Sequence, residues 1–231
     1  SCTGDRMTAL KFEDQEIPNL DDYATLDKQF IPGRRAIFAI VEASLLELVP
    51  EGPVSVLVVG AGRGEEILRH GSDNPDWSFV GVDSYEPMVD LARRHLVETP
   101  AGDRAQVEAT AIDDLDEKNF DAATCIHTAY FVPDDSSKLA FFTAIRARMK
   151  PGTPLAVVDG VGVEGEPQTE LLRRIWTRRA VLNGVMATSA ENFKKVALSV
   201  ERQEELLTSA GFERITPIFR GPAIKGCLVF A

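Results

Sequence analysis

Three closely spaced glycines, Gly60, Gly62 and Gly64, are the residues of this sequence best suited to holding a ligand. They directly follow an apolar, β-branched run over residues 54–59, and a helical pattern begins at Glu65. A run of this kind indicates a strand buried on both faces. Glycines at its end allow a tight turn and a close approach of the backbone to a ligand, and the amides at a helix start point toward that ligand. The stretch therefore predicts a loop for a nucleotide-type cofactor.

The spacing of these glycines and the acids after them narrow the kind of cofactor. A dinucleotide loop reads Gly-x-Gly-x-x-Gly, with its third glycine packed under a pyrophosphate. Here the third glycine comes one residue earlier, and Glu65 and Glu66 follow it. Two carboxylates suit the start of a helix dipole but would repel a pyrophosphate. They are compatible with a ligand that carries an ammonium, a sulfonium and a ribose. The alternative is a glycine-rich turn in another kind of α/β protein.

An acid, Asp83, ends the next strand-like run, residues 77–83. An acid about 20 residues beyond a glycine loop can take both hydroxyls of a ribose, because a carboxylate offers two acceptor oxygens. The alternative role is the N-cap of the following helix, for which Ser84 is a second candidate. Met88, in the first turn of that helix, packs either on an adenine face or in the core.

The remaining apolar runs and helical patterns alternate as they do in an α/β protein. Further strands are expected at residues 105–111, 120–126, 155–159, 214–219 and 223–230, and helices at residues 21–30, 34–49, 65–71, 136–149, 170–185, 189–195 and 199–210. We expect a doubly wound, mostly parallel, seven-stranded sheet whose last two strands are antiparallel. Ligands bind such a sheet at the carboxyl ends of its strands. One domain is expected, with an N-terminal helical lid (1–50), a cofactor-binding core (54–159), a helical insertion (160–212) and a closing hairpin (213–231).

Composition and charge disfavour several classes of function. The 231 residues are 44% hydrophobic and 26% charged, as in a globular protein. The 25 Lys and Arg against 36 Asp and Glu give a net charge of −11, without a basic run, which disfavours a nucleic-acid partner. Neither a signal peptide nor a bilayer-spanning run is recognised, so we expect a cytoplasmic protein without a membrane partner. Cys2, Cys125 and Cys227 have no metal-ligand spacing and indicate neither a metal site nor a disulfide framework.

The motifs together resemble those of class I S-adenosylmethionine (SAM)-dependent methyltransferases. Besides the glycine loop and Asp83, the resemblance includes Phe120-Asp121 at a strand start and the turn at Lys150-Pro151-Gly152. It implies SAM as cofactor and S-adenosylhomocysteine as product. In this superfamily the end of the third strand holds the adenine, which here points to the backbone of Ala111 and Ile112 with Asp113 nearby. The implied cofactor-binding residues are Gly60, Ala61, Gly62, Gly64, Asp83, Ser84, Met88, Ala111, Ile112, Asp113 and Thr128.

A narrower resemblance is to carboxy-SAM synthases. It rests on Ile31-Pro32-Gly33 before the first core helix and on the segments at residues 199–201 and 210–212. That family has a tyrosine after Ile-Pro-Gly and an arginine in the late helical insertion; here Arg34 and Thr188 stand near those positions. We therefore favour methyl transfer to a small-molecule acceptor. An enzyme that handles a carboxylated SAM and a non-catalytic SAM-binding protein are the alternatives.

His127 is the candidate catalytic base, because it follows a strand end and histidine titrates near neutrality. A structural histidine is the alternative reading. His70 and His95 fall beside arginines within helices and are expected on the surface. A homodimer is a further possibility. The candidate acceptor-pocket residues are Tyr23, Arg34, Tyr130 and Trp176.

Overall fold

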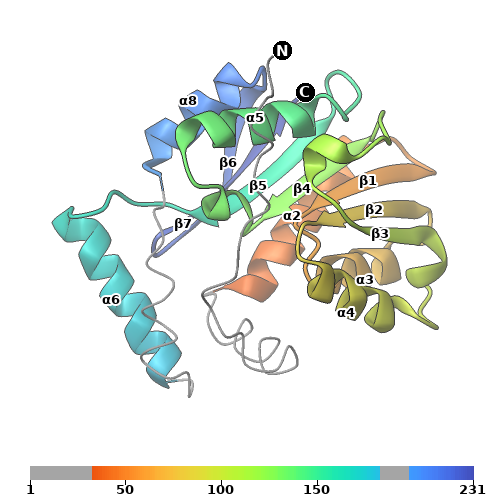
Figure 1. Cartoon of the computed structure of the whole chain (residues 1–231), viewed down its shortest axis with the longest axis horizontal. Helices are drawn as coiled ribbons and strands as arrows, with labels where there is room; N and C mark the ends of the chain where they lie inside the picture. The colour runs from red at the N-terminus through yellow and green to blue at the C-terminus, as the bar shows by residue number, and fades with distance from the viewer. Residues whose placement is uncertain (1–32, 183–197) are drawn as a thin grey trace, which may run out of the picture.

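The fold is a seven-stranded sheet covered on both faces by helices (Figure 1). The computed structural model describes residues 33–182 and 198–231. Across the sheet the strands are β3 (Ala105–Ala109), β2 (Trp77–Asp83), β1 (Val54–Val59), β4 (Ala122–Ile126), β5 (Pro154–Gly160), β7 (Ile224–Phe230) and β6 (Glu213–Gly221). β7 runs antiparallel to β5 and β6, and the other neighbouring pairs are parallel. This order confirms the predicted doubly wound sheet with its closing antiparallel pair.

Helices connect the strands and form the two outer layers. They are α2 (Arg34–Leu48), α3 (Glu65–Asp73), α4 (Glu86–Leu96), α5 (Asp135–Arg146), α6 (Pro167–Leu182) and α8 (Val200–Ser209), with short 3-10 helices η1 (Gly102–Arg104), η2 (Ile112–Asp114) and η3 (Ala129–Phe131). In Figure 1, α2, α3 and α4 lie on one side of the sheet, and α5 and α8 on the other. The helices predicted over residues 21–30 and 189–195 lie outside the described residues. The division into lid, core, insertion and hairpin stays a prediction.

Two helices begin at polar side chains that cap them. The Asp134 carboxylate accepts a hydrogen bond from the Ser137 N–H at 2.8 Å, and the Ser199 hydroxyl accepts one from the Arg202 N–H at 3.1 Å. Such caps satisfy amides that have no partner in the first helical turn. α3 begins instead at Gly64, in a left-handed conformation and without a side-chain cap. An uncapped start of this kind is suited to binding a ligand through its amides.

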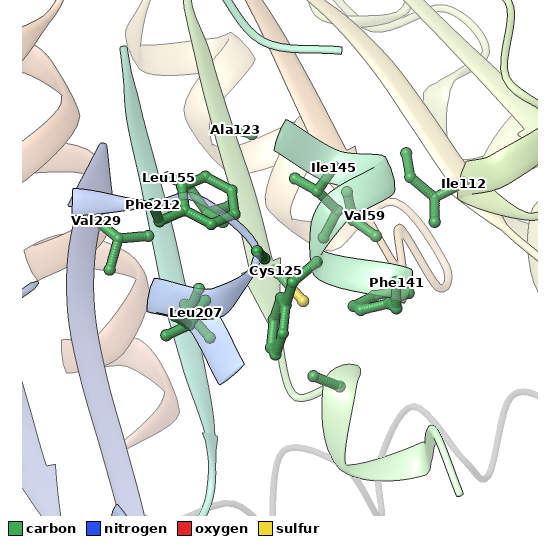
Figure 2. Close-up of a cluster of buried hydrophobic side chains, with 14 of the residues drawn as sticks. Val59, Ile112, Ala123, Cys125, Phe141, Ile145, Leu155, Leu207, Phe212 and Val229 are labelled. Atoms are coloured by element: carbon green, nitrogen blue, oxygen red, sulfur yellow. The ribbon is translucent and has the colours of Figure 1, made fainter. Parts of the chain in front are cut away.

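Successive residues of β1 face opposite helix layers, so this strand is buried on both sides. Leu57 and Val59 belong to the apolar cluster under α5 and α8, whereas Val56 and Val58 belong to the cluster under α2, α3 and α4. Figure 2 shows the first cluster, with Leu207 of α8 among its side chains. This packing on both faces fixes the carboxyl ends of the central strands along one edge of the sheet.

α6 is less completely packed than the other helices. It extends away from the sheet in Figure 1, and Leu171, Ile175 and Leu182 are exposed by 49%, 48% and 77%. Neither α6 nor any other described helix has the length and apolarity needed to cross a membrane.

Candidate active site

The glycine loop between β1 and α3 combines two packed glycines with one that faces open space. All three have left-handed φ angles, of 76° at Gly60, 50° at Gly62 and 79° at Gly64. A Cβ on Gly60 would lie 2.0 Å from the Thr128 hydroxyl oxygen, and one on Gly64 would lie 3.2 Å from the Cβ of Ala92. A Cβ on Gly62 would have no neighbouring atom within 4 Å. Gly60 and Gly64 therefore serve the packing of the loop, while Gly62 leaves room for a ligand.

Asp83, at the carboxyl end of β2, holds this loop in place. Its Oδ2 accepts a hydrogen bond from the Gly62 N–H at 2.9 Å, and its Oδ1 accepts one from the Tyr85 N–H at 2.9 Å. Burial raises the pKa of Asp83, and the two amides oppose that shift. Each carboxylate oxygen keeps a second lone-pair direction, so Asp83 can still accept bonds from two hydroxyls.

The alternative role of Asp83 and Ser84 as helix caps is wrong. The residue at the N-cap position of α4 is Tyr85, and no side chain caps this helix. Ser84 is exposed between them. The carboxylate of Asp83 instead turns back toward the glycine loop.

The predicted adenine-side residues lie next to Asp83. In the sheet register Asp83 of β2 pairs with Ala109 of β3, so Ala111, Ile112 and Asp113 follow within a few residues at the same edge. Ile112 is buried and Asp113 is exposed; the Asp113 carbonyl accepts a bond from Arg148 Nη2 at 2.7 Å. Met88 is also buried, at the start of α4.

A charged cluster surrounds the start of α3. Arg34 Nη2 lies 3.0 Å from Glu65 Oε2, and Arg63 contacts the same oxygen. Glu66 is buried and faces Thr124 of β4. Burial raises the pKa of Glu66 to about 7, opposed by the Thr124 hydroxyl and by the charge of Arg34. Arg34 therefore lies beside the glycine loop, within electrostatic range of both acids.

His127 lies in the turn after β4, in a left-handed conformation with φ of 54°. Its N–H donates to the Val158 carbonyl at 2.7 Å, and its Nε2 is buried with no hydrogen-bond partner among the described residues. Burial, aided by the charge of Arg34, lowers the pKa of His127 to about 3. The prediction that it titrates near neutrality is thus wrong, because the sequence does not reveal that the ring is desolvated. At pH 7 the imidazole is neutral and only weakly basic.

The other two histidines also differ from expectation. His70 is fully buried, with its Nδ1 3.9 Å from Glu66 Oε1, and burial lowers its pKa to about 4. Glu66 and His70 are four residues apart and so share the inner face of α3. His95 is half-buried, and its Nδ1 lies 3.1 Å from the Arg63 carbonyl oxygen.

η3 brings two further candidates to the same edge of the sheet. The Thr128 hydroxyl lies 3.3 Å from the Val59 carbonyl and 3.2 Å from the Ile126 carbonyl. The Tyr130 ring packs on Phe131, with centroids 4.0 Å apart. The turn that carries His127 therefore places Thr128 against Gly60, and Tyr130 follows two residues later in the same turn.

The other two acceptor-pocket candidates, Trp176 and Tyr23, are not placed at the glycine loop by any described contact. Trp176 lies on α6, half-buried against the apolar cluster under α2, α3 and α4. Tyr23 lies outside the described residues.

The sequence did not indicate the buried polar residues Thr124, Lys138 and Asp159. Only Asp159 had a usable signal, because it is an acid at a strand end, as Asp83 is.

Comparison with known proteins finds similarity to SAM-dependent enzymes. A family model described as a methyltransferase domain matches residues 57–155, from β1 to β5. A carboxy-SAM synthase of Actinobacillus pleuropneumoniae is 25% identical over 194 residues, covering 80% of this chain and 79% of that protein. A ubiquinone biosynthesis O-methyltransferase of Dechloromonas aromatica is 33% identical over 100 residues, covering 42% of this chain and 40% of that protein.

Solved structures share the same architecture. The O-methyltransferase family 2 protein of Planctomyces limnophilus superposes with a TM-score of 0.65 at 13% identity, covering 94% of this chain. This chain spans 63% of that protein's chain, which is less than two thirds of its length. The predicted resemblance to class I SAM-dependent methyltransferases, with a narrower likeness to carboxy-SAM synthases, is confirmed. SAM is the cofactor that these relatives imply.

The residues at the loop fit this cofactor. Gly62 leaves open space at the carboxyl end of β1, and Asp83 has acceptor capacity for ribose hydroxyls beside it. Arg34 and the acids at the start of α3 offer opposite charges to a zwitterion. No phosphate group has to be accommodated near those acids.

Proposed function

We propose that this protein transfers a methyl group from SAM to a small-molecule acceptor. The observation that carries the proposal is the open space at Gly62, bounded by an acid that already bonds the Gly62 amide at 2.9 Å. A cofactor ribose placed there would meet Asp83, and its base would lie toward residues 111–113. When bound, SAM supplies an activated methyl group on a sulfonium, so the protein needs to bind, orient and exclude water.

We assign Arg34 to the cofactor rather than to the acceptor pocket. Its guanidinium is bonded to Glu65 at the start of α3, and its charge contributes to the low pKa of His127. A fixed positive charge at the loop suits the carboxylate of an amino-acid group. Glu65 holds the arginine in position until that carboxylate is present.

The turn at residues 127–130 faces the acceptor side in this proposal. His127 is neutral at pH 7, with an Nε2 that lacks a partner among the described residues, so it can share a hydrogen bond with an acceptor hydroxyl. Its low pKa means that it orients the acceptor and is a weak base for it. Tyr130 contributes an aromatic wall. Hydroxyl acceptors are the first class to test, because two of the compared proteins are O-methyltransferases.

The cofactor site is tested by calorimetry with S-adenosylhomocysteine. Asp83→Ala removes the ribose acceptor and one bond to the loop, and should weaken binding by roughly 100-fold, as expected for two lost hydrogen bonds to a charged group. Asp121→Ala is the matched control, because Asp121 also accepts a backbone N–H, from Ser55 at 3.0 Å, but at the opposite end of the sheet. Equal affinity of wild type and Asp83→Ala would refute the assignment.

A carboxylated SAM is the second candidate cofactor, favoured by 25% identity to a carboxy-SAM synthase over 80% of this chain. Mass analysis of the small molecules released from the denatured, purified protein separates the two. Recovery of SAM or S-adenosylhomocysteine supports methyl transfer. Recovery of the carboxylated form contradicts it.

A further inference from the structure

η3 is a very short helix whose backbone is bonded by two buried side chains, one acidic and one basic. Asp159 Oδ2, at the carboxyl end of β5, accepts a hydrogen bond from the Tyr130 N–H at 2.9 Å. Lys138 Nζ, from the first turns of α5, donates to the Ala129 carbonyl at 3.0 Å and also to the Val132 carbonyl. One side chain thus satisfies an amide of η3. The other bonds the carbonyl of Val132, just after η3, and also the Ala129 carbonyl, which accepts the Val132 N–H as well.

These side chains lie in an environment that disfavours charge. Asp159 is 1% exposed and Lys138 is 3% exposed. Burial raises the pKa of Asp159 to about 7, opposed by the Gly160 N–H and by Lys138, and burial lowers the pKa of Lys138. Buried charged groups contribute little net stability, because the cost of desolvating them offsets their attraction to nearby groups. Their geometric effect is larger, since a single turn of 3-10 helix is not stable without partners for its end groups.

The residues that this arrangement fixes are those nearest the proposed acceptor. His127, Thr128 and Tyr130 belong to the same turn, which is also tied to the sheet by the His127 N–H bond to Val158 and by the Thr128 hydroxyl bond to Val59. We propose that Asp159 and Lys138 act as a clamp on η3 and are positioning residues of the active site. They set the place of His127 and Tyr130 relative to the glycine loop without touching the acceptor. This inference rests on the proposed function for its purpose, but the clamp itself can be measured without an acceptor.

NMR of the histidine side chains tests the clamp directly, because the chain has only three histidines. Asp159→Asn keeps the side-chain shape but replaces an acceptor oxygen with an amide. If the clamp holds the turn, the His127 ring becomes hydrated in this variant, and its pKa rises from about 3 toward the ordinary value of 6.5. His70, which is buried on the other face of the sheet, should keep its pKa of about 4 and serves as an internal control for intact folding.

Hydrogen exchange gives a second measurement on the same protein. The peptide covering residues 127–132 should exchange at least roughly 10-fold faster in Asp159→Asn, which corresponds to about 1.4 kcal/mol of lost protection. Asp121→Asn is a matched control, because Asp121 also bonds a backbone amide and pairs with a lysine, Lys150, at the opposite edge of the sheet. That control should change neither His127 nor the exchange of residues 127–132.

Lys138→Met is the second variant, and it tests the clamp if Asp159→Asn does not fold. It removes the two bonds to the η3 carbonyls while keeping the apolar stem. An unchanged His127 pKa and unchanged exchange in either folded variant overturn the clamp. Calorimetry with S-adenosylhomocysteine on the wild type is independent of this result: absence of binding would refute the proposed function and leave the clamp standing.

Discussion

Two glycines of one loop illustrate how differently the same residue type acts at neighbouring positions. Gly60 is required by packing, because the Thr128 side chain occupies the place of its missing Cβ, while Gly62 borders open space. Both have left-handed φ angles. The difference separates the stability of the loop from its ability to bind.

Alanine substitutions at these two positions should therefore have opposite signatures. Gly60→Ala should destabilise the fold by about 2 to 5 kcal/mol, from left-handed strain and the clash with Thr128. Gly62→Ala should cost only about 1 to 2 kcal/mol of left-handed strain, but its methyl group enters the proposed cofactor space. Urea unfolding measures the first effect, and calorimetry with S-adenosylhomocysteine measures the second. Retention of full affinity in Gly62→Ala would mean that the cofactor does not occupy this space.

At the scale of elements, the sequence predicted the strands and helices that a local hydrophobic pattern marks. β1, β2 and β5 are apolar runs ended by glycine or acid, and Asp83 was found because it ends such a run. The inner face of α3 was not found, since Glu66 and His70 are residue types that predict a surface. Tertiary packing makes that face buried, with Phe38 of α2 against His70 and Thr124 of β4 next to Glu66. For the same reason Lys138 was read simply as part of a helix, and its contact with η3 depends on tertiary structure.

Helices α8 and α6 should respond differently to loss of an apolar side chain. Leu207 of α8 is fully buried in the cluster of Figure 2, so Leu207→Ala should lower the free energy of unfolding by about 2 to 5 kcal/mol. Leu182 at the end of α6 is 77% exposed, so Leu182→Ala should change it by no more than about 0.5 kcal/mol. Urea denaturation followed by circular dichroism gives both values. A large effect at Leu182 would show that α6 is covered in solution by another surface, such as a second copy of the chain.

For the molecule as a whole, four buried titratable groups change the free energy of unfolding with pH, two in one direction and two in the other. Glu66 and Asp159 have pKa values raised to about 7, so their contribution is present at low pH and is lost as the pH rises through 7. His70 and His127 have pKa values lowered to about 4 and about 3. Their contribution to stability is therefore fully present above pH 6.5, and it is lost as the pH falls toward 4 and 3. Together these groups favour a stability maximum at about pH 5 to 6.5, on the acidic side of neutrality.

Replacing His70 with leucine tests this balance, because it removes one proton-binding group from the unfolded chain and an imidazole from the core. Between pH 6.5 and about 4 the unfolded wild type binds a proton at His70 that the folded protein excludes. His70→Leu should therefore lose stability less steeply on acidification, by up to about 1.4 kcal/mol per pH unit and roughly 3 kcal/mol in total near pH 4. At pH 7.5 both proteins are uncharged at this position, so any difference between them there reflects packing and does not depend on pH. Urea unfolding at pH 7.5, 6.5, 5.5 and 4.5 gives the two slopes directly. Parallel slopes would show that His70 is protonated in the folded protein, and hence that the inner face of α3 admits water.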